Sequence, residues 1–392
     1  MPELNEYPRA DRMQDIQPFR VMELLSRARQ LEAEGRDIVH MEIGEPDFPS
    51  PEPVIRAVKN AIAEGDVHYT PATGMLALRE AIAGFYLQRY GVLVEPDRIV
   101  VTPGASGALL LVLGSLLNPG QTVLMADPGY PCNRNFVRFL EGCSRSIPVT
   151  AETGYQLTAA QVEANWDEST AAVLLASPSN PTGTVVPKQE LQAISQIVEQ
   201  RGGRLLVDEI YHGLIYDSQA ETILTLNEQA FVINSFSKYF GLTGWRIGWV
   251  VAPAATIPDL DKLAQNLFLA APTPAQHAAL AAFRPETLAI LEQRREAFQQ
   301  RRDYLLPALR ELGFEIPITP QGAFYLYANC ERFTDNSLDF AEALLENAGV
   351  AVTPGLDFGH NQPEKHLRFA YTTSMEQLEE GVRRLHQFIN QS

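Results

Sequence analysis

A lone lysine lies between small and hydroxyl residues in the segment 235–248, which reads SFSKYFGLTGWRIG. Ser235 and Ser237 precede Lys238, and Arg246 follows it by eight positions. A lysine amine near a strand end, with anion-binding donors around it, is typical of a Schiff-base site. A solvated surface loop would contain the same residue types. The elements around the lysine decide between these two interpretations.

The composition indicates a globular protein with an excess of acidic residues. The chain has 392 residues, of which 45% are hydrophobic and 20% are charged, and its formal net charge is −17. This length predicts two domains, or one large domain with a smaller one. The negative charge argues against a nucleic-acid surface and against an anionic membrane as partner.

The cysteines and histidines show no metal-ligand or disulfide pattern. Cys132, Cys143 and Cys330 form no CxxC pair, so we expect three buried free thiols and no metal site. The polar, acidic N-terminus lacks the pattern of a signal peptide. The longest apolar run, 109–117, is too short to span a bilayer. We therefore predict a cytoplasmic protein.

Strand patterns alternate with helical patterns through the middle of the chain. The predicted strands are 98–102, 122–126, 144–149, 171–176, 203–207 and 231–234. This alternation predicts an α/β fold with a mostly parallel sheet that helices cover on both faces. Ligands bind such sheets at the carboxyl ends of the strands. The loops at these ends carry the candidate chemistry, namely 103–107, 127–131, 177–183, 208–211 and 235–238.

The flanking segments predict a second, smaller unit. A helical stripe starts at residue 19, and a strand follows at 38–43. Helices are predicted at 53–64, 76–90, 276–282, 285–312, 338–347 and 375–390, and strands at 323–327, 349–353 and 366–370. We divide the chain into an N-terminal segment 1–45 that joins the small domain, a large domain 46–284, and a small α+β domain 285–392.

Pyridoxal 5′-phosphate would account for the residue types at these strand ends. Lys238 supplies the amine, and Asp208 supplies a carboxylate for the pyridine nitrogen, which keeps the ring protonated. Asn180 and Tyr211 are donors for the 3′-oxygen, and Tyr130 is an aromatic cover for one ring face. A helix cap or a buried ion pair is the alternative role for Asp208.

The phosphate group of this cofactor requires amides, hydroxyls and a fixed cation. The candidates are Gly104, Ala105, Ser106, Ser235, Ser237 and Arg246. A substrate carboxylate requires a second arginine, and Arg368 in the segment LRFA is the candidate. Gly44 has no side chain, so its amide can approach a ligand closely.

Nine segments in this order resemble the class I and II aminotransferases, the pyridoxal-phosphate enzymes of fold type I, over nearly the whole chain. They are IGEPDFPSP at 43–51, YTPATGMLALREAIA at 69–83, VTPGASGALL at 101–110, DPGYP at 127–131, SPSNPTG at 177–183, VDEIY at 207–211, SFSKYFGLTGWRIG at 235–248, GAFYLY at 322–327 and LRFAY at 367–371. Several are weak signals alone, but together they are specific.

The resemblance implies ping-pong transamination between an amino acid and a 2-oxo acid. It implies that Lys238 is both the Schiff-base lysine and the general base, and that Arg368 clamps the substrate carboxylate with help from the Gly44 amide. It gives Asp208, Tyr211, Asn180, Tyr130 and the phosphate donors the roles set out above. It also implies a homodimer in which Tyr69 reaches the neighbouring phosphate.

Two features of the sequence bear on the choice of substrate. No arginine occurs between Arg246 and Arg284, and the segment 266–273 is mostly apolar. This favours a neutral or apolar amino donor, with an aspartate-type donor as the alternative, and 2-oxoglutarate or pyruvate as acceptor. Phe19 is a candidate specificity residue.

Two other functions fit the same residues. A carbon–sulfur β-lyase would use the same fold and cofactor. A non-catalytic ligand-sensing domain would be fused to a helix-turn-helix segment, for which we expect no room in the irregular first 18 residues.

Overall fold

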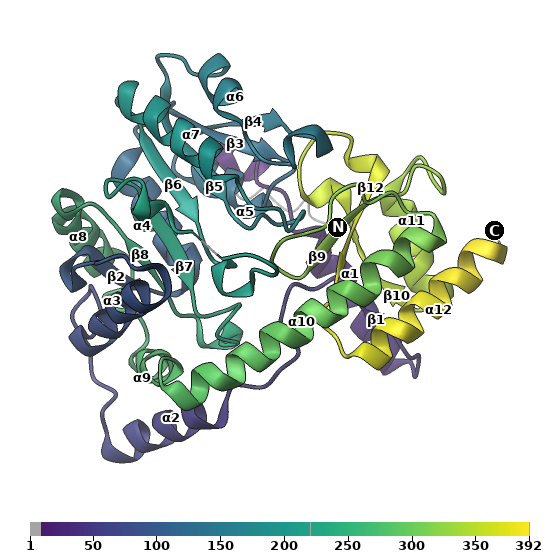
Figure 1. Ribbon diagram of the computed structural model, residues 1–392, viewed down its shortest axis with the longest axis horizontal. Coiled ribbons are helices and arrows are strands. Elements are labelled where there is room, and N and C mark those ends of the chain that lie inside the picture. The colour runs from purple at the N-terminus through teal and green to yellow at the C-terminus, as the bar shows by residue number, and fades with distance from the viewer. Residues whose placement is uncertain (1–8, 220, 392) are drawn as a thin grey trace, which may run out of the picture.

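The computed structural model describes residues 9–219 and 221–391, and its centre is a seven-stranded sheet (Figure 1). The strand order is β2-β8-β7-β6-β5-β3-β4. The strands are β2 (Ile99–Thr102), β3 (Thr122–Asp127), β4 (Cys143–Pro148), β5 (Thr170–Ala176), β6 (Arg204–Asp208), β7 (Phe231–Ser235) and β8 (Gly248–Val251). Only β8 runs against its neighbours β2 and β7. The predicted α/β fold with a mostly parallel sheet is confirmed.

Side chains of the central strands alternate between two hydrophobic cores, one on each face of the sheet. In β6, Leu205 and Val207 join one core and Leu206 joins the other. Ile194 of α7 packs in the first core, and Leu111 of α4 packs in the second. The helices of this part are α2 (Glu52–Glu64), α3 (Leu76–Tyr90), α4 (Gly104–Leu116), α5 (Pro131–Phe139), α6 (Ala159–Ala164), α7 (Lys188–Gln200), α8 (Ile257–Leu267) and α9 (Thr273–Ala282).

Three of these elements have no counterpart in the sequence-based expectation. The helix α6 buries only Val162, so it has no strong apolar stripe. The helix α8 does carry apolar residues at helical spacing, at positions 257, 260, 263, 264 and 267, and the sequence reasoning overlooked them. The strand β8 is short and fully buried, and its antiparallel direction breaks the strand–helix alternation. It follows the lysine segment directly and pairs Gly248 with Ser235.

The two ends of the chain meet in a second group of strands. The strand β1 (Val39–His40) pairs in parallel with β10 (Val350–Ala351), beside α12 (Met375–Gln391) (Figure 1). An antiparallel sheet has the order β11-β12-β9, with β11 (Thr353–Pro354), β12 (His366–Ala370) and β9 (Tyr325–Asn329). The helices here are α1 (Arg20–Ala33) and α11 (Ser337–Ala343). This pairing agrees with an N-terminal segment that joins the C-terminal part, while the domain boundaries stay a prediction.

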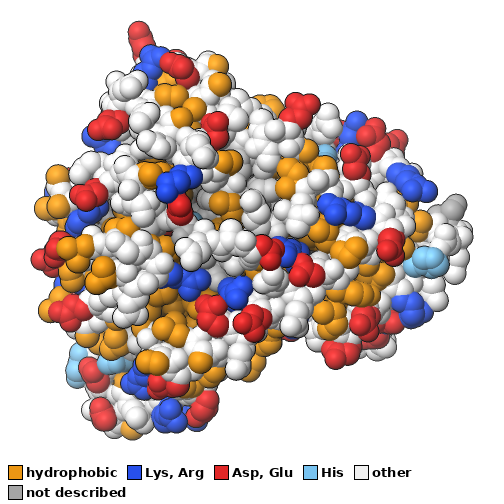
Figure 2. Space-filling model, in the orientation of Figure 1, with side chains coloured by type: hydrophobic (Ala, Val, Ile, Leu, Met, Phe, Trp, Pro, Cys, Tyr) orange, Lys and Arg blue, Asp and Glu red, His pale blue; other side chains and the backbone are white. Residues whose placement is uncertain are grey.

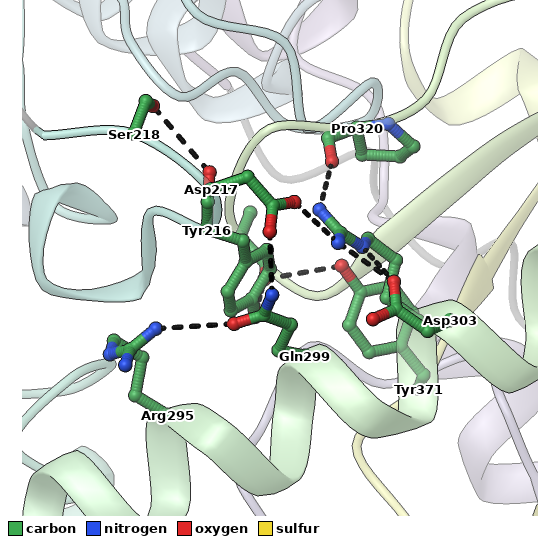
Figure 3. Close-up of polar contacts among 10 residues, drawn as sticks. Tyr216, Asp217, Ser218, Arg295, Gln299, Asp303, Pro320 and Tyr371 are labelled. Atoms are coloured by element: carbon green, nitrogen blue, oxygen red, sulfur yellow. Dashed lines mark hydrogen bonds and ion pairs between the residues drawn. The ribbon is translucent and has the colours of Figure 1, made fainter.

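The long helix α10 (Pro285–Leu312) contacts α2 and α9 of the large part and α12 of the small part (Figure 1). Arg302, on this helix, has a buried side chain that donates to the Pro320 carbonyl oxygen at 3.0 Å and to Asp217 Oδ2 at 2.7 Å. Gln299 donates to Asp217 Oδ1 at 2.7 Å (Figure 3). These contacts fix the loops around Asp217 and Pro320 against the helix.

The surface carries acidic, basic and apolar side chains interspersed on the face drawn in Figure 2. Among the residues described, none of the helices is long and apolar enough to cross a membrane. Cys330 is buried, but Cys132 is partly exposed and Cys143 is exposed. The expectation of three buried thiols is therefore wrong, because Cys143 begins the edge strand β4, whose first residues face solvent.

We predict that Arg302→Met lowers the free energy of unfolding by about 2 kcal/mol, because the Pro320 carbonyl loses its donor in a buried place. Calorimetry of the purified protein would show this as a lower Tm. Arg383→Met is the matched control, since Arg383 pairs with Glu380 on the exposed face of α12. It should change the stability by less than about 0.5 kcal/mol. Equal effects of the two variants would refute a special role for the Arg302 contacts.

Candidate active site

The loops at the carboxyl ends of the parallel strands surround one cavity, together with the start of α1 and residues of the small sheet. Most of the residues selected from the sequence line it. They are Phe19, Gly44, Ala105, Ser106, Tyr130, Asn180, Asp208, Tyr211, Ser235, Ser237, Lys238, Arg246 and Arg368. Gly104 lies directly beside this lining, at the start of α4. Tyr69 does not line the cavity, and its side chain is 84% exposed.

Lys238 follows the end of β7 and points its amine into the cavity. The amine donates a hydrogen bond to the Gly44 carbonyl oxygen at 2.6 Å. Burial, with a smaller contribution from the positive charge of Arg368, lowers the pKa of Lys238 to about 8. A larger fraction of this amine is therefore neutral near neutral pH than for an ordinary lysine, as a nucleophile or general base requires.

Asp208 ends β6 and is buried, with 7% of its surface exposed. Its Oδ1 accepts a hydrogen bond from the Ile210 amide at 3.1 Å, and it forms no ion pair with any residue of 9–219 or 221–391. Burial raises the pKa of Asp208 to about 6. A buried carboxylate without a counter-ion is costly, so this side chain suits a ligand that presents a positive charge.

Three elements build an anion-binding cup at one end of the cavity. The helix α4 points its N-terminus into it, after Gly104 in the left-handed conformation with φ +72°. A Cβ at Gly104 would lie 2.7 Å from Nη2 of Arg246, so only glycine lets the guanidinium approach this closely. The Ser235 and Ser237 hydroxyls hydrogen-bond each other at 3.0 Å. Arg246 has no carboxylate partner in the part of the chain that is described.

Arg368 lies on β12 and is 3% exposed. It donates to Asn180 Oδ1 at 2.9 Å and to Thr353 Oγ1 at 3.2 Å, and its guanidinium carbon lies 4.3 Å from the centre of the Tyr325 ring. Its Nε has no hydrogen-bond partner, and no carboxylate of the described residues is within ion-pair distance. The positive charge of Arg368 is thus available to an anionic ligand.

Tyr325 is a cavity residue that the sequence reasoning missed. Its hydroxyl lies 2.9 Å from that of Tyr211, and burial raises the pKa of both phenols. A Cβ at Gly44 would collide with the Tyr325 hydroxyl, so glycine is required at this position. The segment GAFYLY at 322–327 was the available signal, but it did not indicate which of its aromatic residues faces the cavity.

Two of the aromatic residues predicted for the site contact each other. Tyr130 and Phe19 are arranged edge to face, with 6.2 Å between ring centroids and an angle of 87°. Phe19 lies at the start of α1, whereas Tyr130 precedes α5. The cavity therefore has an aromatic wall built from segments far apart in sequence.

The residues present fit pyridoxal 5′-phosphate. Asp208 is a buried carboxylate that lacks a cation, and Arg246 and the α4 N-terminus form a cup that lacks an anion. Lys238 lies in the same cavity as both. A phosphorylated pyridine aldehyde supplies all three missing partners.

The fold and this set of residues define a pyridoxal-phosphate enzyme of fold type I. The profile of the family "Aminotransferase class I and II" matches residues 36–385. The chain is 38% identical to the valine–pyruvate aminotransferase of Mycobacterium tuberculosis, over 94% of this chain and 96% of that protein. It is 34% identical to the aspartate/prephenate aminotransferase of Thermus thermophilus, over 95% and 96% of the two chains.

A solved structure of an aminotransferase from Mycobacterium tuberculosis superposes with a TM-score of 0.95 at 36% identity and covers 98% of this chain and all of that one. The chain belongs to the class I and II aminotransferases. It is a pyridoxal-phosphate-dependent aminotransferase, which confirms the family, the enzyme class and the cofactor predicted from the sequence. The non-catalytic alternative finds no support among these relatives.

We predict that Asp208→Asn stabilises the cofactor-free protein above pH 6. The pKa of Asp208 in the folded protein, about 6, exceeds its usual value of 3.8. Its contribution to stability is therefore present below about pH 4 and is lost as the pH rises through 6. Urea unfolding should show a gain on the order of 2 kcal/mol at pH 8 that shrinks toward pH 4.

The control for this prediction is Asp259→Asn, at an exposed position of α8, which should change stability little at either pH. With cofactor bound, the order should reverse, because the asparagine offers no charge to the ring nitrogen. A cofactor-free Asp208→Asn protein that is less stable than the wild type at pH 8 would contradict the assignment of an uncompensated charge.

Proposed function

We propose that the enzyme transfers the amino group of a neutral or apolar amino acid to pyruvate. 2-Oxoglutarate is the second candidate acceptor, because its distal carboxylate would meet the same lack of a counter-charge as an acidic donor. The distribution of cations in the cavity carries this proposal. Of the described residues, only Lys238, Arg246 and Arg368 bring a lysine or arginine to the cavity wall. The cofactor engages the first two, and the substrate α-carboxylate engages the third. No further arginine or lysine is left for an acidic side chain of the donor.

The wall that faces the donor side chain is mostly apolar. Its members are Phe19, Val21, Met22, Ile43 and Leu109. Glu45 also lines the cavity and would repel a second carboxylate. An apolar donor side chain gains from this burial, whereas a dicarboxylic one would lose hydration without a counter-charge.

When bound, pyridoxal phosphate supplies an electron sink for the bond changes at the substrate Cα. Lys238 would hold the cofactor, and its amine would take the substrate Cα proton and return it. Asp208 would keep the ring nitrogen protonated. Tyr211 and the Asn180 amide would donate hydrogen bonds to the ring oxygen, and Tyr130 would cover one ring face.

The remaining roles concern binding. Arg368 clamps the α-carboxylate, and the Gly44 amide, in the loop after β1, lines the same cavity and assists it. Phe19 contacts the donor side chain. The phosphate is held by the cup described above, formed by Gly104, Ala105, Ser106, Ser235, Ser237 and Arg246.

The relatives support the range of partners. One is named a valine–pyruvate aminotransferase, which combines an apolar donor with pyruvate. Others are named aspartate/prephenate aminotransferases, and they are the reason to keep an aspartate-type donor as the second candidate.

A screen of amino donors against 2-oxoglutarate and pyruvate tests the proposal. We expect apolar donors such as valine to give a kcat/KM at least about tenfold above that for aspartate, a difference typical of one mismatched polar contact in a pocket. The control is Lys238→Ala, which should lose turnover of every donor while the protein stays folded. A preference for aspartate with all acceptors would refute the apolar assignment.

Single-turnover reactions with the same donors separate transamination from β-elimination. Transamination leaves pyridoxamine phosphate on the enzyme and releases a 2-oxo acid. Release of pyruvate and ammonia from a sulfur-containing amino acid, with the cofactor retained as the aldehyde, would instead identify a carbon–sulfur lyase.

A homodimer with shared sites is also part of the proposal, and so is a cytoplasmic location. Tyr69 is an exposed aromatic residue that does not line the cavity of its own chain, as expected for a residue that serves a neighbouring site. Tyr69→Phe should weaken cofactor binding about tenfold by loss of one hydrogen bond to phosphate, with an unchanged dimer in sedimentation. Tyr304→Phe, on α10, is the control. Unchanged cofactor affinity in Tyr69→Phe would contradict the shared site.

A further inference from the structure

The apolar wall of the cavity includes the first turn of α1, and the N-cap residue of this helix provides no side-chain hydrogen bond. Phe19 occupies the N-cap position of α1, and its side chain accepts no hydrogen bond from the first turn. The first amides of the helix bond to Asp357 instead. Arg20 N donates to Asp357 Oδ1 at 3.0 Å, and Val21 N donates to Oδ2 at 2.9 Å. The cap thus comes from a residue 336 positions away from Val21 in the sequence.

The carboxylate of Asp357 is well suited to this position. It is 4% exposed, and its two oxygens each accept from one of two adjacent amides. Free amides at a helix N-terminus carry partial positive charge, so a buried carboxylate stabilises them more than a neutral acceptor does. An asparagine would turn its NH₂ group toward one of these donors and lose that contact.

The backbone around Asp357 is itself held by the other parts of the cavity. Arg134 donates to the Asp357 carbonyl oxygen at 2.9 Å, and Gly129, next to Tyr130, donates to the Phe358 carbonyl oxygen at 2.8 Å. The ring of Phe358 lies 4.9 Å from the Arg368 guanidinium carbon. Residues 357 and 358 therefore contact the start of α1, the Tyr130 loop and the carboxylate clamp at the same time.

The loop that follows leaves little freedom for Asp357 to move. The Asp127 carboxylate, at the end of β3, accepts hydrogen bonds from the amides of His360 and Asn361. A Cβ at Gly359 would collide with the same carboxylate. The cap is therefore mounted on a loop that is tied to the large sheet.

We propose that Asp357 is a positioning residue that sets the preference for apolar donors, by holding Phe19, Val21 and Met22 in place as one wall of the cavity. Asp357 does not line the cavity and acts through α1. This inference rests on the proposed function, because it assumes that the donor side chain packs against this wall. Without the cap, the first turn of α1 frays and the wall loses its fixed distance from Tyr130.

Hydrogen exchange on the holoenzyme tests the structural part of the proposal, namely that Asp357 orders the first turn of α1. We compare wild type, Asp357→Asn, Asp357→Ala and the control Thr158→Ala, which removes the cap of α6 on the large sheet. The amides of residues 20–22 should exchange at least about tenfold faster in both Asp357 variants and at the wild-type rate in Thr158→Ala. Unchanged exchange at residues 20–22 in Asp357→Ala would overturn the proposal.

Steady-state kinetics with valine and alanine as donors test the functional half. In Asp357→Asn, the KM for valine should rise about tenfold with kcat nearly unchanged, and the KM for alanine should rise less, because alanine reaches the wall least. In a Phe19→Ala background, the same Asp357 substitution should have little further effect on the KM for valine. Thr158→Ala should leave both donors unaffected.

Different results would refute the role of Asp357 and the proposed donor class. Faster exchange at residues 20–22 with an unchanged KM for valine would make Asp357 a purely structural cap and overturn the proposal. Additive effects of Phe19→Ala and Asp357→Asn would overturn it as well. A wild-type enzyme that does not use valine would instead refute the proposed donor class, and this result needs no Asp357 variant.

Discussion

Two buried charges without protein counter-ions dominate this structure. Asp208 and Arg368 are almost completely enclosed, and each has only hydrogen bonds to neutral groups of the described chain. Burying such charges costs free energy, so they are typical of sites where a bound ligand supplies the opposite charge. The sheet holds Asp208 at the end of β6, and the small antiparallel sheet holds Arg368 on β12. In our proposal, the cofactor ring and the substrate carboxylate supply the complementary charges.

The antiparallel direction of β8 brings Arg246 to the other end of the cavity. If β8 were parallel to β7, a crossover connection would have to carry the chain back to the other edge of the sheet before β8 could begin. Because β8 is antiparallel, the chain turns back after Lys238, and Arg246 lies two residues before β8 begins. Its guanidinium then comes within contact of Gly104, at the N-terminus of α4. The lysine and the arginine are thus eight residues apart and line one cavity, where we propose that they bind the same ligand.

The sequence predicted the features that depend on local pattern. The parallel strands end in loops with Asp208, Asn180, Tyr130 and Lys238, and parallel strand ends must share one edge of a sheet, so the shared cavity could be expected. The strand β8 was not predicted, because direction in a sheet leaves no periodic signal. Tyr325 was not predicted either, since a fully buried aromatic segment does not reveal which ring faces a ligand.

The role of Asp357 was not predicted from the sequence for a different reason. A cap is normally sought within a few residues of the helix that it serves, as with Thr158 and α6. Here the acceptor reaches α1 from a loop near the other end of the chain, so no local pattern marks it. The same folding that pairs β1 with β10 brings this loop to the first turn of α1. In our proposal, the cavity wall that faces the donor side chain is therefore set by tertiary contacts, separately from the residues that hold the cofactor.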